Sequence, residues 1–527
     1  MLQRRASDRL TGDIVASPPR AFWEHPVFLG LLLFAVAIPL LGPPVPPLTD
    51  LPGHMGRYHV QLNLAHSPEL RQYYGFDWAV IGNLGVDLLI VPMARLFGLE
   101  LGTKLIVLAI PVLTAAGFLL VAREVHGRIP PTALFALPLT YSYPFQFGFV
   151  NFALSVALCF LALALWIRLG RNGRFRLRAL LFVPIGCLVW LCHIYGWGML
   201  GVLAFGAEAA AQRDRGRGWF MALLRGALGT YPLLPPVLLM LTWRSGDVEG
   251  VTADWFNWEF KGLWLIGILH ERWATWDKAV ALFLMLLPLW FLLRFRPRFA
   301  TALLIPFLIF AALFVLLPRI LLGSAYADMR LAPFAVAVGI LGIAPQGTWL
   351  GRHGRALAAV ALLLFAARTA VTTTVFSDIS DSWKRQLAAI EHIDHGKRVL
   401  VLISLPCFRE WRSDRMEHIG SLAVVRRSSF VNGQWAMAGA QLMTIRYRNG
   451  QPFVGDPSQM LRPRQCYTMR DQLNLALQEH DAFDYLWLAN MPPGKWPSHP
   501  QWQRLWSGPT TILYRSLTAR PVGPVVN

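Results

Sequence analysis

Charged residues are scarce in this chain of 527 residues. Only 15% are Asp, Glu, Lys or Arg, whereas 55% are hydrophobic and 12% are aromatic. A soluble domain carries about 25% charged residues, and a disordered chain combines low hydrophobicity with high net charge. The composition excludes both classes. With a mean hydropathy of +0.44, it indicates a protein whose apolar side chains face lipid.

Acidic residues are much rarer than basic ones. The chain has 30 Asp and Glu against 49 Lys and Arg, so its net charge is +19. The cations gather in short clusters between apolar runs: Arg4 to Arg9, Arg168 to Arg178, Arg213 to Arg217, Arg294 to Arg298, and Arg352 to Arg355. This distribution is typical of the short cytoplasmic loops of a polytopic membrane protein. The clusters are not interleaved with exposed aromatic residues, so we expect no nucleic-acid partner.

Nucleotide and metal motifs are missing from the sequence. It contains no Walker loop, no strand-borne GxGxxG, no HExxH and no CxxC pair. Without an ATP site, any energy must come from an activated donor or from a gradient.

Cysteine is also rare, with five residues in the chain. Cys159, Cys187 and Cys192 lie in apolar runs, where a thiol is usually a small packed hydrophobe. Cys407 and Cys466 lie in the polar C-terminal region. If this region faces an oxidising compartment, we expect a disulfide between them, and a buried unpaired thiol is the alternative.

The apolar runs predict a polytopic α-helical membrane protein with about eleven spans, or up to thirteen. Residues 1–26 read as a cytoplasmic tail, because no small-residue cleavage site follows them. The expected spans are 27–41, 101–121, 133–142, 149–167, 180–192, 196–211, 227–243, 279–293, 300–317, 331–343 and 356–370.

The stretch 79–97 is apolar but contains Asn83 and Asp87, which share a helical face because they stand four residues apart. Basic clusters flank the region 27–121 at both ends, so both flanks are expected in the cytoplasm and the number of crossings between them is even. Since 27–41 is one crossing, only one more fits between 79 and 121. We expect 79–97 to be tilted, re-entrant or facing a cavity, although two crossings are the alternative.

The composition changes after Thr374, where charged residues become frequent. We therefore predict a multi-span domain over 27–375, with a large first outer loop 43–78, and a separate α/β domain over 376–527. In that domain we expect helices at 381–394 and 471–480, and strands at 398–403, 422–425, 442–447, 485–488 and 510–517. An odd number of spans puts this domain on the side opposite to the N-terminus.

Asp50 is the first candidate for a functional role. It directly follows the proline-rich exit of the first span, 43–47, whose prolines prevent the helix from continuing. Its carboxylate would then lie close to the bilayer surface. The alternative is that Asp50 only caps the next helix, since Asp is a good N-cap residue.

Further polar residues are expected at the same membrane face: His54, Arg57, Asn83, Asp87, Asn151, His193, Tyr195, Lys261, His270, Arg272, Asp328 and Arg330. Carboxylates with several cations and histidines at one face suit an anionic substrate carried by a lipid. Two alternatives stay open: Asp328 and Arg330 form a local ion pair, and His193 is a packed or interfacial residue.

Several stretches together carry a resemblance to a known family. They are TDLPGH (49–54), GNLGVDL (82–88), GFVNF (148–152), HIGSLAVV (418–425) and FV (430–431). With the proline-rich exit and the outer α/β domain, they resemble a poorly characterised bacterial branch of the GT-C superfamily of membrane glycosyltransferases. The resemblance implies inverting transfer of a sugar from a polyprenyl-phosphate carrier to a glycan, lipid or protein acceptor. It places the reaction at the outer face of the bacterial inner membrane, with the C-terminal domain periplasmic.

The resemblance also assigns roles. The carboxylate of Asp50 would deprotonate the acceptor hydroxyl or help to bind a divalent metal. The next residue is Leu51 rather than a second acid, which leaves metal dependence open. Apart from the resemblance, a phosphate leaving group is stabilised by nearby cations, and the candidates for this role are Lys261, His270, Arg272 and Arg330.

Two other functions compete with a transferase. One is a transporter or a flippase for lipid-linked sugars, and the other is a non-catalytic membrane scaffold with a periplasmic sensing domain. Transporters often show inverted repeats and charges near the midplane. This sequence shows no internal repeat and gathers its candidate residues at one face, so we favour the transferase.

Overall fold

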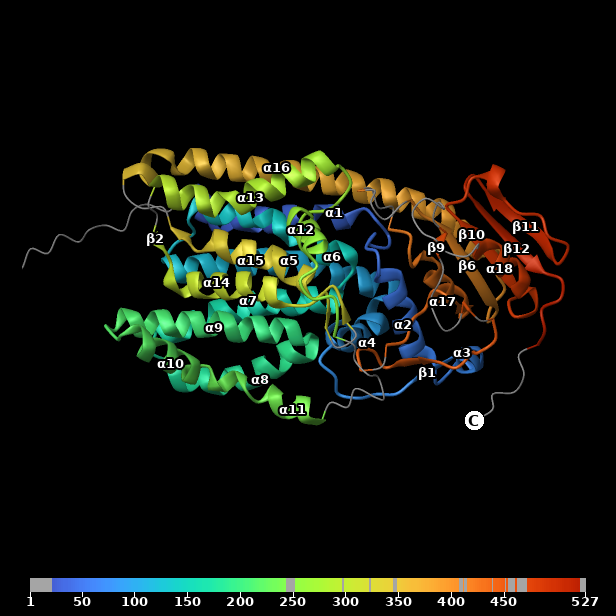
Figure 1. Cartoon of the computed structure of the whole chain (residues 1–527), viewed down its shortest axis with the longest axis horizontal. Coiled ribbons are helices and arrows are strands. Elements are labelled where there is room, and N and C mark those ends of the chain that lie inside the picture. The colour runs from blue at the N-terminus through green and yellow to red at the C-terminus, as the bar shows by residue number, and fades with distance from the viewer. Residues whose placement is uncertain are drawn as a thin grey trace, which may run out of the picture.

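The computed structural model describes most of the chain and shows a long helical bundle with a mixed domain at one end (Figure 1). The described residues are 21–242, 252–295, 298–321, 324–344, 348–406, 411, 415–437, 439–450, 452–453, 460–461 and 472–521.

Long apolar helices form the bundle. In the described part of the chain, six are long and apolar enough to cross a membrane: α5 (Leu99–His126), α7 (Val150–Arg171), α8 (Phe175–Cys192), α9 (Ile194–Asp214), α13 (Ala274–Phe295) and α16 (Thr348–Leu387). Two apolar helices are shorter, α1 (Pro26–Leu41) and α14 (Thr301–Leu316). The prediction of a helical, multi-span membrane protein is confirmed at this level.

The bundle has a buried centre and an apolar outer surface. All 15 residues of α15 (Ala327–Leu341) are buried at the centre. On the periphery, Leu31 and Phe34 of α1 are 63% and 60% exposed, whereas Val36 and Leu40 on the same helix are fully buried. Large apolar side chains exposed in rows along such helices are suited to contact with lipid.

Two of the predicted spans are not continuous α-helices, because proline interrupts them. The region 133–142 is a buried 3-10 helix, η2 (Pro131–Tyr141), which contains Pro138. The region 227–243 is divided among α10 (Trp219–Gly229), η3 (Tyr231–Leu233) and α11 (Pro236–Thr242). Pro232, Pro235 and Pro236 lack the amide hydrogen that a continuous helix needs.

The stretch 79–97 contains one short helix, α4 (Gly85–Phe97). Its 13 residues reach about 20 Å, which is less than the roughly 30 Å of a hydrocarbon core.

Three of the basic clusters lie at one end of the bundle, which we call the basic end. It comprises the turn 172–174 between α7 and α8, the turn 215–218 between α9 and α10, and the first residues of α16. Figure 1 shows these turns at the end away from the C-terminal domain. We call the opposite end, next to that domain, the domain end.

The C-terminal domain is joined to the bundle without a break in structure. Helix α16 has 40 residues and runs straight through the predicted boundary at 376 into the domain. The domain contains a six-stranded sheet with the order β11-β12-β10-β6-β7, in which β9 pairs with β6. Its strands are β6 (Arg398–Ser404), β7 (Phe430–Val431), β9 (Met460–Leu461), β10 (Tyr485–Ala489), β11 (Trp502–Gly508) and β12 (Thr511–Ser516).

The predicted strands 398–403, 485–488 and 510–517 correspond to β6, β10 and β12, with β6 parallel to β10 and β12 antiparallel to it. The predicted helix 471–480 contains α18 (Gln472–Gln478), and the predicted helix 381–394 is the end of α16 and the 3-10 helix η4 (Ala388–His392).

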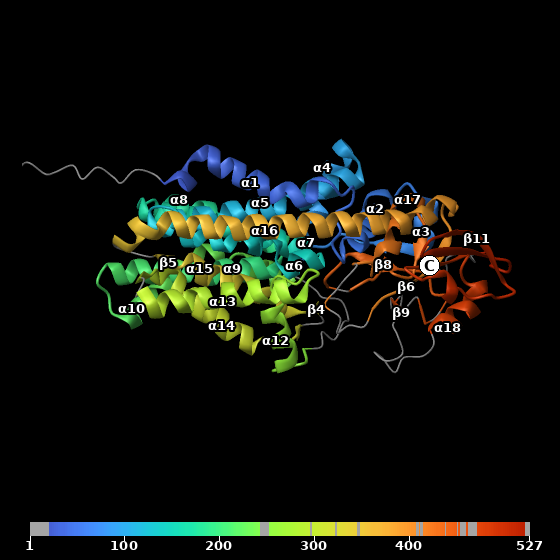
Figure 2. The same cartoon turned by 90° about the horizontal axis from the view of Figure 1, so that it is seen from above.

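Two predicted strands differ because they pack against the first outer loop. That loop folds into α2 (Leu51–Asn63), α3 (Pro68–Tyr73) and β1 (Tyr74–Phe76). The region 422–425 is a helix, α17 (Leu422–Arg427), that packs against α2. Within 442–447, strand β8 (Met443–Ile445) pairs antiparallel with β1 instead of joining the large sheet. Figure 2 shows α2, α3 and α17 together at the domain end.

Glycines on α9 test the packing of the bundle. A Cβ placed on Gly206 would lie 2.4 Å from the ring of Pro306, whereas one on Gly201 would meet nothing within 4 Å. We expect Gly206→Leu to lower the free energy of unfolding by about 1–3 kcal/mol through overpacking. Gly201→Leu is the matched control, since both changes replace a helical glycine by the same residue. Thermal unfolding in detergent measures both, and equal midpoints would contradict the close α9–α14 contact.

Candidate functional site

The backbone of Asp50 is fixed by the loop before α7. The N–H of Asp50 donates to the carbonyl of Phe147 at 2.8 Å, and the N–H of Thr49 donates to the carbonyl of Gln146 at 3.3 Å. Gly148 adopts a φ of 103°, and a Cβ built there would lie 2.8 Å from the nitrogen of Asp50. Both the left-handed conformation and the close approach require glycine at this position.

The side chain of Asp50 does not act as a helix cap. Asp50 occupies the N-cap position of α2, but its carboxylate makes no capping hydrogen bond. Instead, its Oδ1 lies 3.7 Å from Nε2 of His418, and the two side chains are 14% and 17% exposed. The carboxylate is therefore mostly enclosed, still reachable, and not used by the end of the helix.

His418 presents a lone pair to Asp50. Its Nδ1 lies 3.3 Å from the carbonyl of Gly433, and since a carbonyl only accepts hydrogen bonds, Nδ1 carries the hydrogen. In the neutral ring, Nε2 is then an acceptor that faces the carboxylate. Burial lowers the pKa of His418 to about 4, so the ring is neutral near pH 7.

The surroundings make Asp50 a stronger base than an exposed aspartate. Burial raises the pKa of Asp50 well above its ordinary value, and the charge of Glu417 raises it further. The cation of Arg330 acts in the opposite direction. Burial and two charged residues from other parts of the chain thus set the basicity of this carboxylate.

His54 lies one turn after Asp50 on α2. Its ring stacks on Tyr58, with centroids 6.4 Å apart, and meets the indole of Trp435 at 5.6 Å. Burial and the nearby cation of Arg57 lower the pKa of His54, which keeps it neutral. The structure therefore places His54 in the wall beside Asp50.

Arg330 is a buried cation without a carboxylate partner in the part of the chain that the structure describes. It is 7% exposed, and its guanidinium lies 4.3 Å from the ring centre of Phe149 and 5.9 Å from that of Tyr195. Its Nη1 donates to Ser324 Oγ at 3.0 Å, and its Nε is buried without an acceptor. Burying a guanidinium without a compensating charge costs free energy. A phosphate would compensate the charge and accept two parallel hydrogen bonds from the guanidinium.

The predicted alternative of a local pair between Asp328 and Arg330 is wrong, because Asp328 pairs with Lys261 at 3.1 Å. Lys261 also donates to the carbonyls of Phe314 and Leu317, both at 2.8 Å. All three donors of this ammonium are therefore used, two of them at the end of α14 and one by Asp328 on α15.

His270 and Arg272, two other candidates for the phosphate, are also occupied. The ring of His270 lies against that of Trp411, with centroids 4.1 Å apart and the planes tilted by 36°, and its Nε2 is 2.5 Å from the carbonyl of that residue. Arg272 pairs with Asp378 on α16. Both link the bundle to the C-terminal domain or to the helix that leads into it.

Arg57, Asp87 and Asn151 form one buried network. The guanidinium of Arg57 lies 2.9 Å from Asp87, and both side chains are less than 5% exposed. Asn151 donates to the same carboxylate at 2.9 Å and accepts from the N–H of Val86 at 2.6 Å. These side chains hold α2, α4 and α7 together, and through α2 they position Asp50.

The remaining predicted residues have local partners. Asn83 donates to the carbonyl of Ala440 at 2.8 Å. His193 accepts from the N–H of Tyr195 at 3.1 Å at the start of α9, and the hydroxyl of Tyr195 donates to the carbonyl of Ala327 at 2.9 Å. Tyr195 therefore helps to build the enclosure of Arg330. Cys407 and Cys466 lie outside the described residues, so their predicted disulfide stays a prediction.

The C-terminal domain completes the site with residues 415–437. Arg415 donates to the carbonyl of Pro47 at 2.9 Å and to the side chain of Gln146. Trp435 packs so closely on α2 that a Cβ on Gly53 would lie 2.0 Å from its ring. No sequence pattern identified Glu417, His418 or Trp435 as site residues. The stretch 418–425 belonged to the resemblance, but no local pattern placed it beside Asp50.

The donor set at Asp50 fits a base better than a resident metal. Asp50 and His418 provide two ligands, whereas catalytic zinc sites use three protein ligands. Across the described ranges, no group of three or more His, Cys, Asp or Glu side chains stands at metal-binding spacing.

The comparisons with known proteins concern the fold. No family model matches the sequence, and no curated protein matches it. The structure of ArnT from Cupriavidus metallidurans bound to undecaprenyl phosphate aligns with a TM-score of 0.52 and 12% identity, over 95% of this chain and 100% of that chain. The chain has the GT-C fold. The apo state of the same ArnT aligns with a TM-score of 0.49 and 12% identity, over 94% and 98% of the two chains.

The network behind the site gives a stability prediction. Asp87→Asn removes the charge that compensates buried Arg57, so we expect a loss of about 3–5 kcal/mol in the free energy of unfolding. The control is Glu100→Gln, which breaks the ion pair with Arg426, whose side chains are about one-third exposed. That pair contributes at most about 1 kcal/mol. Thermal unfolding in detergent compares the two variants, and a stable Asp87→Asn protein would refute the positioning role of the network.

Proposed function

We propose that this protein is an inverting glycosyltransferase. It moves a sugar from a polyprenyl-phosphate carrier to an acceptor of the cell envelope. The observation that carries the proposal is the pair formed by Asp50 and His418, because this carboxylate serves neither as a helix cap nor in a structural ion pair. The shared fold with ArnT, whose structure holds undecaprenyl phosphate, supports a lipid-phosphate donor.

Asp50 is the general base of the proposed reaction. It takes the proton of the acceptor hydroxyl while the acceptor oxygen forms its bond to the anomeric carbon. The bond between that carbon and the phosphate oxygen breaks on the opposite face, which inverts the configuration. The raised pKa of Asp50 suits this role, since a base is most effective when its pKa approaches the working pH.

His418 supports the protonated state of Asp50. Once the carboxyl group carries the acceptor's proton, it becomes a donor toward the Nε2 lone pair of His418. A rotation that closes the 3.7 Å gap gives a hydrogen bond to the neutral ring. We therefore assign His418 as a positioning residue that accepts a hydrogen bond from the protonated carboxyl group of Asp50.

Arg330 binds the leaving phosphate in this proposal. The polyprenyl phosphate leaves with both electrons of the broken bond, so negative charge grows on its oxygens. A guanidinium that is already buried needs little reorganisation to stabilise this charge, and its fork matches two oxygens. Lys261, His270 and Arg272 contribute less to donor binding, because their donors are engaged elsewhere.

We place the site on the periplasmic face of a bacterial inner membrane, since the basic end of the bundle is the end that stays in the cytoplasm. A reporter that is active only in the periplasm should be active when fused to the C-terminus and silent when inserted after Gly173, in the turn between α7 and α8. Activity in the reverse pattern would contradict this orientation.

Asp50→Asn tests the base directly. The change preserves size and removes most of the basicity, so we expect sugar transfer to fall about a hundredfold or more. Because Asp50 makes no capping bond, thermal stability should stay within about 0.5 kcal/mol of the wild type. A strain with this variant should accumulate lipid-linked sugar. Normal envelope glycans with altered solute or lipid-linked sugar transport would instead favour a transporter or flippase.

The charges around Asp50 predict opposite shifts in the pH profile. A base is lost as the pH falls through its pKa, so the acidic limb of kcat/KM reports the pKa of Asp50. Glu417→Gln removes a charge that raises this pKa, and the limb should move to lower pH. Arg330→Gln removes a charge that lowers it, and the limb should move to higher pH.

Arg330→Lys is the matched control for these profiles. It keeps the cation and loses the fork, so the rate should fall while the acidic limb stays close to that of the wild type. Shifts of Glu417→Gln and Arg330→Gln in the same direction would exclude Asp50 as the titrating base.

A further inference from the structure

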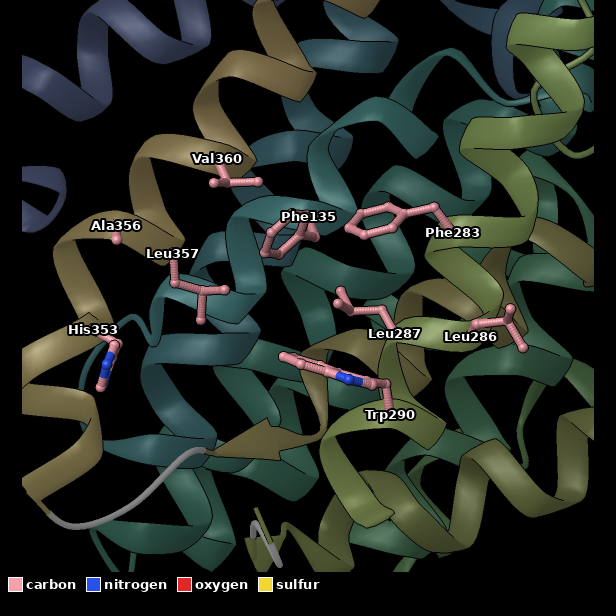
Figure 3. Close-up of a pocket in the computed structure, with 9 residues that line it drawn as sticks. All are labelled: Phe135, Phe283, Leu286, Leu287, Trp290, His353, Ala356, Leu357 and Val360. Carbon is pink, nitrogen blue, oxygen red and sulfur yellow. The ribbon is translucent and has the colours of Figure 1, made fainter. Parts of the chain in front are cut away.

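An apolar pocket lies in the bundle on the side of the basic end. It has a volume of about 530 Å³ and is formed by η2, α13 and α16 (Figure 3). Its wall consists of Phe135, Phe283, Leu286, Leu287, Trp290, His353, Ala356, Leu357 and Val360. The volume lies within the range of about 300–1,000 Å³ that is typical of ligand pockets.

The pocket is polar at one end only. On α13 the lining runs from Phe283 to Trp290, and on α16 it runs from Val360 back to His353. The two helices are antiparallel, so Trp290 and His353 both lie toward the basic end. Seven residues of helix correspond to about 10 Å, so the apolar part extends about that far toward the middle of the bundle.

The pocket opens toward lipid. Leu286 and Trp290 are each 49% exposed, and Val360 is 52% exposed. Next to them, Leu293 of α13 and Leu363 of α16 are 75% and 70% exposed, which marks the surface around the opening as lipid-facing. An apolar space of this kind does not hold ordered water, because ordered water needs polar partners, and it suits a hydrocarbon chain.

We propose that this pocket is a binding site for an anionic phospholipid of the leaflet at the basic end. One acyl chain lies between α13 and α16, and the headgroup lies at the level of His353 and Trp290. An indole at this level is typical of the membrane interface, and the basic clusters at this end attract anionic headgroups.

This site is separate from the proposed transferase site. Asp50 and Arg330 lie at the domain end, whereas His353 and Trp290 lie toward the basic end on the first turns of α16 and the last turns of α13. A lipid whose phosphate sits at Arg330 has its headgroup at the opposite face of the bundle. The inference therefore does not depend on the proposed function.

The experiment uses the full chain, purified in mild detergent and analysed for retained lipid by native mass spectrometry. Wild-type protein should retain an anionic phospholipid in preference to a zwitterionic one of equal chain length. Leu357→Trp fills the pocket and should reduce retention at least about tenfold, since excluding even two methylene groups costs that much affinity. Leu363→Trp is the matched control on the lipid-facing side of α16 and should retain the lipid.

Two further variants keep the test decisive. Ala356→Trp fills the same pocket from a more exposed position and replaces Leu357→Trp if that variant does not fold. His353→Ala should reduce the preference for the anionic headgroup while an acyl chain is still retained. Equal retention in wild type and both filling variants would overturn the site. A retained polyprenyl phosphate that is lost when the pocket is filled, or equal retention of a zwitterionic lipid, would overturn the assigned ligand.

Discussion

The ion pair between Arg57 and Asp87 is the interaction on which the geometry of the site depends. It is almost completely buried, and Asn151 completes it from α7. Through it, α2 is held against α4 and α7, and the first turn of α2 carries Asp50 and His54. Burying a charge without its partner costs several kcal/mol, so the pair fixes the position and the direction of α2.

The C-terminal domain also holds α2. Gly53 and Gly56 have no side chain, and a Cβ at either position would collide with Trp435 or Gln434. The side-chain amide of Gln434 donates to the carbonyl of Gly53 at 3.1 Å. The domain thus approaches the backbone of α2 directly and brings His418 to Asp50. The proposed base and its partner come from opposite ends of the chain, so the site exists only when the domain is docked.

The buried charged side chains at the domain end differ in whether a carboxylate neutralises them. Lys261 and Asp328 satisfy each other and the end of α14, which makes them part of the framework. Arg330 is enclosed by aromatic rings and has a hydroxyl as its hydrogen-bond partner. The energetic cost of Arg330 is offset when an anion binds, which links the stability of this region to the proposed donor. At the basic end, the pocket beneath His353 is apolar and involves no such charge.

The sequence by itself determined the class of protein and several elements. Its apolar runs predicted the long helices, and the β-branched runs predicted β6, β10 and β12, because hydrophobic periodicity is a local property. It also pointed to Asp50, since proline before a polar residue at a span exit is a local pattern. It could not separate framework from site among Arg57, Asp87, Lys261 and Arg330. The partner of each charge lies far away in the chain, and only tertiary packing decides which charges are neutralised. The same reason hid His418: its role depends on a lone pair that faces Asp50 across the interface between two domains.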